Sequence, residues 1–165
     1  LVGSEMCIRD SLKPSPRDVA TYNLKPEMAA YELTDALLEE INQETADFIV
    51  LNFANTDMVG HTGIFSAAQK AAEVVDSCVG RIVEAALKHN YTTFILADHG
   101  NSDCMVNEDG SPNTQHSTNP VPLIVVDKNR RWNLKHGKLG DIAPTILTVM
   151  QIPIPTEMIG DILVS

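Results

Sequence analysis

The sequence has few cysteines and no long hydrophobic run. Its three cysteines, Cys7, Cys78 and Cys104, show no CxxC spacing, so we expect free thiols in a reducing compartment rather than a disulfide framework. No apolar run approaches the ~20 residues of a membrane-spanning helix, and no charged-then-apolar stretch at the start resembles a signal peptide. These absences make a globular, cytoplasmic protein the expectation.

Positive charge is also scarce. The chain has 12 Lys and Arg against 22 Asp and Glu, which gives a formal net charge of −10. Such a chain repels nucleic acid and anionic membranes, so we expect neither as a partner. If the substrate is an anion, metal ions must reverse the local field. The length of 165 residues and the 44% hydrophobic content fit one ordinary domain.

Three segments show the periodicity of helices. The first follows Lys25, with Pro26 in its first turn, and ends near Glu44, and Asp141 can cap the last. A longer helix between them ends near His89 and Asn90. Its expected buried stripe consists of Phe65, Ala68, Ala72, Val75, Val79, Ile82 and Ala86.

Three short apolar runs, at 47–53, 92–97 and 121–126, predict buried strands. Strands alternating with helices predict an α/β fold with a mainly parallel sheet flanked by helices. Ligands of such sheets gather beyond the carboxyl ends of the strands. The first two runs are followed there by the polar loops "NTDMVGHTG" (55–63) and "DHGN" (98–101).

These loops and the one before the third strand hold five candidate metal ligands, namely Asp57, His61, Asp98, His99 and His116. Aspartate and histidine together suit Zn²⁺ or Mn²⁺. Asp57, His61 and His116 would supply three ligands and leave an open position, as in a catalytic site. Asp98 and His99 supply only two, so a second site would be incomplete. His89 and His136 lack such partners and are expected at the surface.

Each candidate ligand also has a plainer explanation as a cap, a turn residue or an exposed group. Their combination in three loops at one end of a sheet favours metal binding. The sequence identifies no activated Ser, Thr or Cys as a nucleophile. A catalytic role for Cys104 is the less favoured alternative to a plain free thiol. There is also no Gly-rich phosphate loop. Composition and spacing therefore predict a metal-dependent α/β domain, with phosphate esters as a candidate substrate class.

The two loops, together with "HSTNPVP" (116–122), resemble the cofactor-independent (2,3-bisphosphoglycerate-independent) phosphoglycerate mutases of the alkaline phosphatase superfamily. The resemblance extends through 15–35 and 137–152. It implies that residues 14–165 are the C-terminal part of an incomplete, alkaline-phosphatase-like domain. Residues 1–13 do not resemble the family, and we expect them to be disordered or non-native.

The resemblance also implies a ligand set. Asp57, His61 and His116 match the ligands of one Mn²⁺, and Asp98 and His99 match two ligands of a second, with Zn²⁺ or Co²⁺ as alternatives. The family's serine nucleophile and its remaining aspartate ligand have no match here, so no catalytic residue is assigned and we expect the chain to be inactive alone. Thr56 and Ile64 depart from the usual proline and methionine, and neither is a ligand.

The implied activity is that of an isomerase of glycolysis and gluconeogenesis. It interconverts 3-phosphoglycerate and 2-phosphoglycerate through a phosphoserine intermediate and is expected to be a monomer when complete. Two alternatives remain open. One is another metalloenzyme of the superfamily, such as a phosphopentomutase, an alkaline phosphatase or a sulfatase. The other is a non-catalytic metal-binding remnant.

Overall fold

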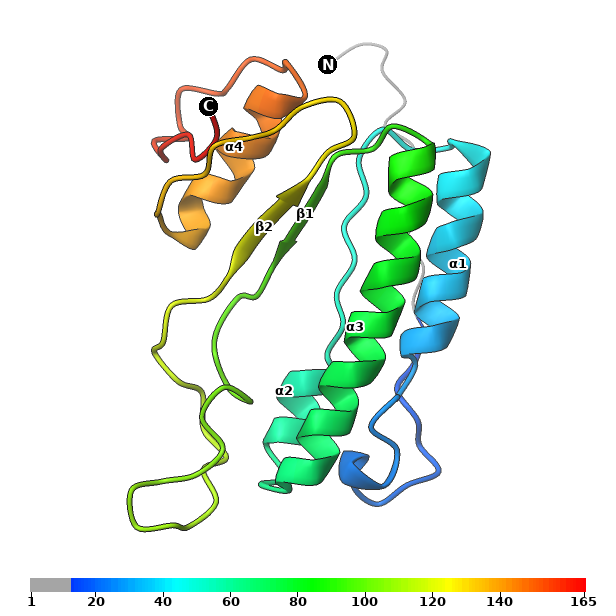
Figure 1. Ribbon diagram of the computed structural model, residues 1–165, viewed down its shortest axis with the longest axis vertical. Coiled ribbons are helices and arrows are strands. Elements are labelled where there is room, and N and C mark those ends of the chain that lie inside the picture. The colour runs from blue at the N-terminus through cyan, green and yellow to red at the C-terminus, as the bar shows by residue number, and fades with distance from the viewer. Residues whose placement is uncertain (1–12) are drawn as a thin grey trace.

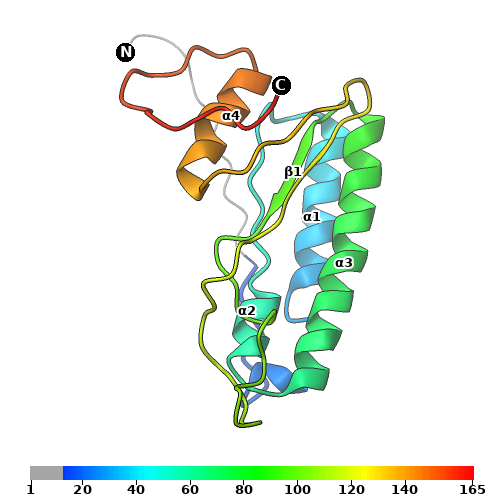
Figure 2. The same ribbon diagram turned by 60° about the vertical axis from the view of Figure 1, so that its left-hand side comes forward.

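A computed structural model describes residues 13–165 of the chain. The elements follow in the order η1 (Tyr22–Leu24), α1 (Ala30–Gln43), α2 (Asn55–Gly60), α3 (Phe65–Lys88), β1 (Thr93–Leu96), β2 (Leu123–Val126), η2 (Leu139–Asp141) and α4 (Ile142–Val149). In Figures 1 and 2, α1 and α3 lie side by side against one side of the two strands, and α4 lies near one end of the strands. Apart from Lys13, the expected leader lies outside the described residues.

The three predicted helices are confirmed, with shifted ends. Helix α1 begins four residues after Pro26, because residues 26–29 form a turn in which Met28 has a φ of 46°. It ends where expected, with Glu44 in the left-handed conformation. Helix α3 is capped by His89, and the following Asn90 has a φ of 61°, as its position at a helix end favours.

The predicted buried stripe of α3 is wrong in part. Phe65 and Ala72 are exposed, and the buried face is instead Ala67, Ala68, Ala71, Val74, Cys78, Ile82 and Ala86. The reason is close packing at the start of the helix. There the small alanine side chains form a core cluster with Met28, Val59 and Met105, because alanine lets neighbouring segments approach more closely than a phenylalanine would.

The predicted parallel arrangement is wrong for the one strand pair within residues 13–165. Strands β1 and β2 are antiparallel, with Thr93 opposite Val126 and Leu96 opposite Leu123. A parallel pair needs a long crossover, usually a helix, but the connection 97–122 contains none and reverses the chain. Residues 47–53, predicted as a strand, form neither a helix nor a strand, although they run alongside β1 (Figure 1). Helices around a small sheet still agree with the expected incomplete α/β domain.

The connection between the strands is a long irregular hairpin. Beyond β1 and β2 its two arms meet again at the antiparallel bridges between Gly100 and Ser117 and between Val106 and Pro112. The buried Met105 packs the outgoing arm against the cluster formed by α2 and α3. The hairpin therefore holds residues 98–103 and 114–119 next to each other and next to α2.

The opposite end of the molecule is tied together by a buried carboxylate. Asp141 precedes α4 as predicted, but its side chain accepts the backbone N–H groups of Lys138 (2.9 Å) and Asp161 (3.0 Å) instead of capping α4 itself. The Thr145 hydroxyl accepts the Leu163 N–H at 2.9 Å. These bonds fix the C-terminal segment on α4.

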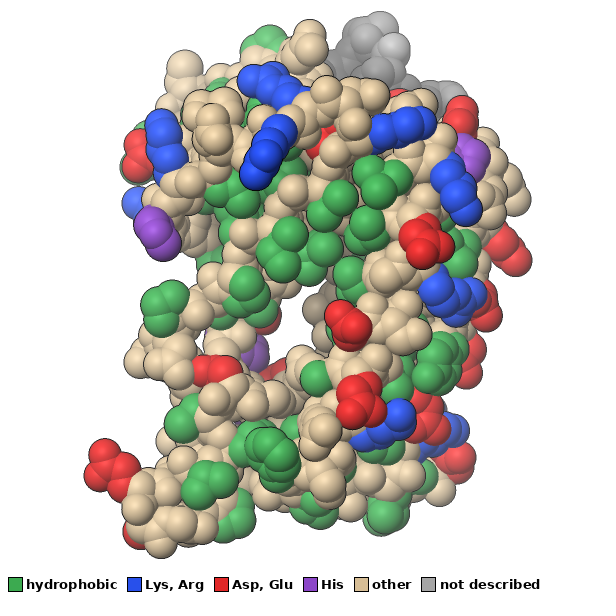
Figure 3. All heavy atoms as spheres, in the orientation of Figure 1, with side chains coloured by type: hydrophobic (Ala, Val, Ile, Leu, Met, Phe, Trp, Pro, Cys, Tyr) green, Lys and Arg blue, Asp and Glu red, His purple; other side chains and the backbone are tan. Residues whose placement is uncertain are grey.

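The central face of the molecule displays hydrophobic side chains between the strands and the helices (Figure 3). Phe48, Val50, Leu96 and Ile124 are all exposed. Cys78 is buried and Cys104 half-buried, and both are free thiols as predicted, whereas Cys7 lies outside the described residues. Within residues 13–165, we find no helix with the length and apolar character needed to cross a membrane.

Candidate metal centre

Helix α2 presents two of the predicted ligands on one side. Its start is anchored by the buried Asn55, whose Nδ2 donates to the backbone oxygens of Pro26 and Glu27, both at 2.8 Å. Asp57 and His61 are one helical turn apart, and residues at this spacing are neighbours on a helix surface. The Oδ1 of Asp57 therefore lies 3.1 Å from the Nε2 of His61.

The returning arm of the hairpin brings His116 to the same point. Its Nε2 lies 3.1 Å from the Asp57 Oδ1 and 3.2 Å from the His61 Nε2. The three atoms thus form a nearly equilateral triangle. Ligand atoms of a tetrahedral ion with bonds of about 2.0–2.1 Å are about 3.3 Å apart. The geometry of the trio predicted from the sequence fits a single metal ion.

The hydrogen bonding of His61 leaves its Nε2 able to bind a metal ion. Its Nδ1 lies 2.6 Å from the backbone oxygen of Thr114, which can only accept, so Nδ1 carries the proton. In the neutral ring, Nε2 then directs a lone pair at the Asp57 carboxylate. Two such acceptors repel each other unless a metal ion or a proton lies between them. Metal-binding histidines commonly donate their other N–H to a backbone carbonyl in this way.

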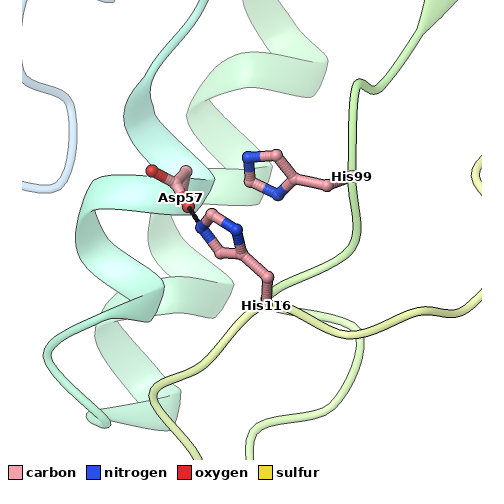
Figure 4. Close-up of side chains that lie close together, drawn as sticks. All are labelled: Asp57, His99 and His116. Carbon is pink, nitrogen blue, oxygen red and sulfur yellow. Dashed lines mark hydrogen bonds and ion pairs between the residues drawn. The ribbon is translucent and has the colours of Figure 1, made fainter.

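His99 joins the same cluster from the outgoing arm. Its ring stacks on that of His116 with 3.7 Å between centroids, and ligand atoms of Asp57, His99 and His116 all lie within 4.8 Å of one another. Figure 4 shows these three side chains converging, with the Asp57–His116 contact dashed. The structure thus places His99 beside the first trio.

Asp98 is the outlying member of the predicted set. Its side chain is 84% exposed, and its Oδ1 lies 3.7 Å from the His99 Nε2. Asp98 and His99 therefore form an open, two-ligand pair at the edge of the first trio. The assignment of this pair to a second ion stays a prediction.

Two further residues, outside the predicted set, shape the turn beside the candidate ligands. Asn101 is buried and donates from Nδ2 to the Asp57 Oδ1 at 2.9 Å. The Asp103 carboxylate accepts hydrogen bonds from Asn119 and Ser117, and these bonds hold the pKa of Asp103 below its usual value. In the sequence, only their position could have indicated these residues, since both lie in the turn directly after the predicted ligands.

The two histidines left out of the site behave differently. His136 is exposed, as expected. His89 does have a partner, because its Nδ1 lies 2.8 Å from a Glu44 carboxylate oxygen and joins the ends of α3 and α1. This contact connects the two helices, and His89 is not part of the group of candidate ligands.

A groove opens beside the cluster. It has a volume of about 670 Å³ and is lined by His61, Thr62 and Ile64 on one side and by residues 19–23 on the other. A small molecule in this groove would contact the same histidine that faces Asp57.

The fold and this cluster define an incomplete α/β domain whose loops gather aspartate and histidine side chains in a geometry suited to a metal ion. The family model described as "Metalloenzyme superfamily" matches residues 5–154, and the chain belongs to that superfamily.

The chain is also similar to curated 2,3-bisphosphoglycerate-independent phosphoglycerate mutases. It is 61% identical to that of Flavobacterium psychrophilum over 147 residues, covering 89% of this chain and 29% of the relative. It is 54% identical to that of Bacteroides thetaiotaomicron over 154 residues, covering 93% and 30%. The chain therefore spans somewhat less than a third of the length of these relatives.

The fold has a counterpart among solved structures. Crystal structures of Leishmania mexicana phosphoglycerate mutase at low cobalt concentration include a chain that matches with a TM-score of 0.83 and 27% identity, over 93% of this chain and 31% of that one. This match confirms the predicted fold class as part of a larger α/β domain.

Proposed function

We propose that this chain is part of a 2,3-bisphosphoglycerate-independent phosphoglycerate mutase, an isomerase that interconverts 3-phosphoglycerate and 2-phosphoglycerate in glycolysis and gluconeogenesis. The observation that carries the proposal is the Asp57, His61 and His116 trio, with atoms 3.1–3.2 Å apart, in a chain 61% identical to such a mutase. Since the chain spans under a third of that relative, the activity of the whole enzyme goes beyond the aligned region.

We assign the trio to one divalent cation and Asp98 with His99 to two positions around a second. Mixed aspartate and histidine ligands suit Mn²⁺, Zn²⁺ and Co²⁺. Mn²⁺ is the cation that we propose, and the cobalt of the Leishmania mexicana structures supports the tolerance for related ions.

When bound, such ions lower the pKa of a hydroxyl nucleophile and neutralise charge that develops on a transferred phosphoryl group. The residues of this chain prepare the site for them. The Thr114 carbonyl accepts a hydrogen bond from the His61 Nδ1 and so leaves Nε2 as the nitrogen that can bind a metal, and Asn101 donates to the Asp57 carboxylate. The groove beside His61 would admit a small phosphorylated substrate.

The described residues offer no nucleophile in contact with the cluster, so we propose that the 165-residue chain has negligible mutase activity by itself. A cytoplasmic location and a monomeric complete enzyme are part of the same proposal. The free thiols of Cys78 and Cys104 support a reducing compartment.

A chimera tests this function. The aligned segment of the Flavobacterium psychrophilum mutase is replaced by residues 15–165 of this chain, and formation of 2-phosphoglycerate is followed with added Mn²⁺. We expect turnover within about tenfold of the parent mutase and its loss in the Asp57→Ala chimera. A folded chimera that binds Mn²⁺ without turnover would favour the non-catalytic alternative. Turnover of a pentose phosphate instead would favour the phosphopentomutase alternative.

A further inference from the structure

Asn101 contacts the candidate metal ligands but cannot itself complete their set. Its side-chain nitrogen lies 2.9 Å from the Asp57 Oδ1, 3.5 Å from the Asp57 backbone oxygen and 3.4 Å from the His61 Nε2. An amide nitrogen carries two protons and donates only. Its shortest contact is to the carboxylate oxygen that also faces both His61 and His116.

The other half of the same side chain is poorly accommodated. Asn101 is 6% exposed, and its Oδ1 is buried without a hydrogen-bond partner among the described residues. A buried acceptor left unpaired destabilises the folded chain. The oxygen also packs so closely on Gly60 that a Cβ there would lie 2.2 Å from it. As a contribution to folding alone, an asparagine is a poor choice for this position.

We infer that Asn101 is a positioning residue for the metal centre, an inference that rests on the cation site proposed above. By donating to the Asp57 Oδ1, the amide fixes the carboxylate in the orientation in which this oxygen points between the two histidines. When the Asn101 Nδ2 lies beside Asp57, the Oδ1 of the same amide is left buried without a hydrogen bond.

The neighbouring Ser102 provides a matched control. Its hydroxyl donates to the Thr56 backbone oxygen at 2.7 Å, so it attaches the same turn to the same helix. It makes no hydrogen bond to a candidate ligand side chain. A role in docking the turn on α2 would therefore appear in both residues, whereas a role in positioning the carboxylate belongs to Asn101 alone.

The test compares the purified 165-residue chain with its Asn101→Ala and Ser102→Ala variants. Co²⁺ affinity is measured from the visible absorption of the bound ion, and the Tm of the metal-free proteins is measured by circular dichroism. Contacts to metal ligands from outside the ligand set are typically worth about 10–100-fold in affinity. We expect that loss in Asn101→Ala with a Tm equal to or above that of the parent. Ser102→Ala should bind within about threefold and show a lower Tm.

Each contrary result has a distinct meaning. If the parent chain fails to bind Co²⁺, the proposed cation site is wrong and this inference falls with it. If the parent binds and Asn101→Ala binds equally well, the positioning role alone is wrong. It is also wrong if Asn101→Ala lowers the Tm or fails to fold, because the residue would then serve the structure of the turn.

Discussion

The His61 ring is joined to the Thr114 backbone oxygen by a hydrogen bond of 2.6 Å. This contact links α2 to the returning arm of the hairpin, 53 residues further along the chain. It also determines which nitrogen of the ring is free, because a carbonyl oxygen cannot donate. A backbone carbonyl thereby leaves Nε2 as the nitrogen that would bind the proposed cation.

The first prediction concerns His116. Replacing it by alanine removes one corner of the ligand triangle, so Co²⁺ or Mn²⁺ affinity should fall by more than the ~100-fold upper range for outer contacts. Isothermal titration of the purified chain measures this change. His136→Ala, which removes an exposed histidine outside the cluster, should leave the affinity unchanged. Equal losses in both variants would contradict the assignment of His116.

The second prediction concerns Asp98. Its side chain is 84% exposed, so Asp98→Ala should change the free energy of unfolding of the metal-free chain by no more than about 0.5 kcal/mol. The affinity of the chain for the first ion, the one assigned to Asp57, His61 and His116, should also be unchanged. In the Flavobacterium chimera, however, turnover should be lost because a second-ion ligand is missing. Near-normal turnover of that variant at saturating Mn²⁺ would exclude Asp98 as a ligand.

The third prediction compares two glycines. A Cβ on Gly60 would lie 2.2 Å from the Asn101 Oδ1 and 2.8 Å from the Ser102 Oγ, so Gly60→Ala should destabilise the chain by about 1–3 kcal/mol. Gly80, inside α3, has nothing within 4 Å, and Gly80→Ala should stabilise it by about 0.5–1 kcal/mol. Urea unfolding measures both changes. Similar stability of the two variants would refute the close packing of α2 on the turn.

The fourth prediction concerns the buried Asp141. Hydrogen bonds from the Lys138 backbone, and then from that of Asp161, lower the pKa of its carboxyl from the usual 3.8. A lowered folded-state pKa gives stability that is complete above the unfolded value and is lost as the pH falls through the folded one. The Tm should therefore drop below about pH 4, where the unfolded chain binds the proton more readily.

Asp141→Asn isolates that contribution. The variant should have a lower Tm than the parent at neutral pH, with a smaller difference between the two in acid. Glu157→Gln, which removes an exposed carboxyl from the same C-terminal segment, should follow the parent at every pH. Parallel pH curves for the parent and Asp141→Asn would show that this carboxylate does not contribute as proposed.

Helix positions were predictable from the sequence because the periodicity of α1 and α3 reports local geometry. Which face of α3 is buried was not, since it depends on how closely Ala67 and Ala71 approach Met28 and Met105. The antiparallel pairing of β1 and β2 could not be predicted from the pattern of apolar residues either. A short apolar run does not show the direction of its neighbour, although the lack of a helix in 97–122 pointed to a reversal.

The proximity of Asp57 and His61 was predictable because residues spaced by one helical turn are neighbours on a helix surface. The stacking of His99 on His116 was not, because it follows from the pairing of Gly100 with Ser117 across the hairpin. The sequence gives no indication of a role for Asn101, because an asparagine after a glycine is typical of any turn. Its importance lies in the atom that it contacts, which only the folded chain reveals.

The long hairpin has a final consequence for the durability of the fold. Asp57 and His116 are 59 positions apart, so a cation held by both would act as a reversible cross-link that closes a large loop of the chain. Ligands that bind only the folded state raise its population in proportion to their free concentration. Chelation should therefore expose the tip of the hairpin to proteases, and the half-life of the chain would report the metal supply around it.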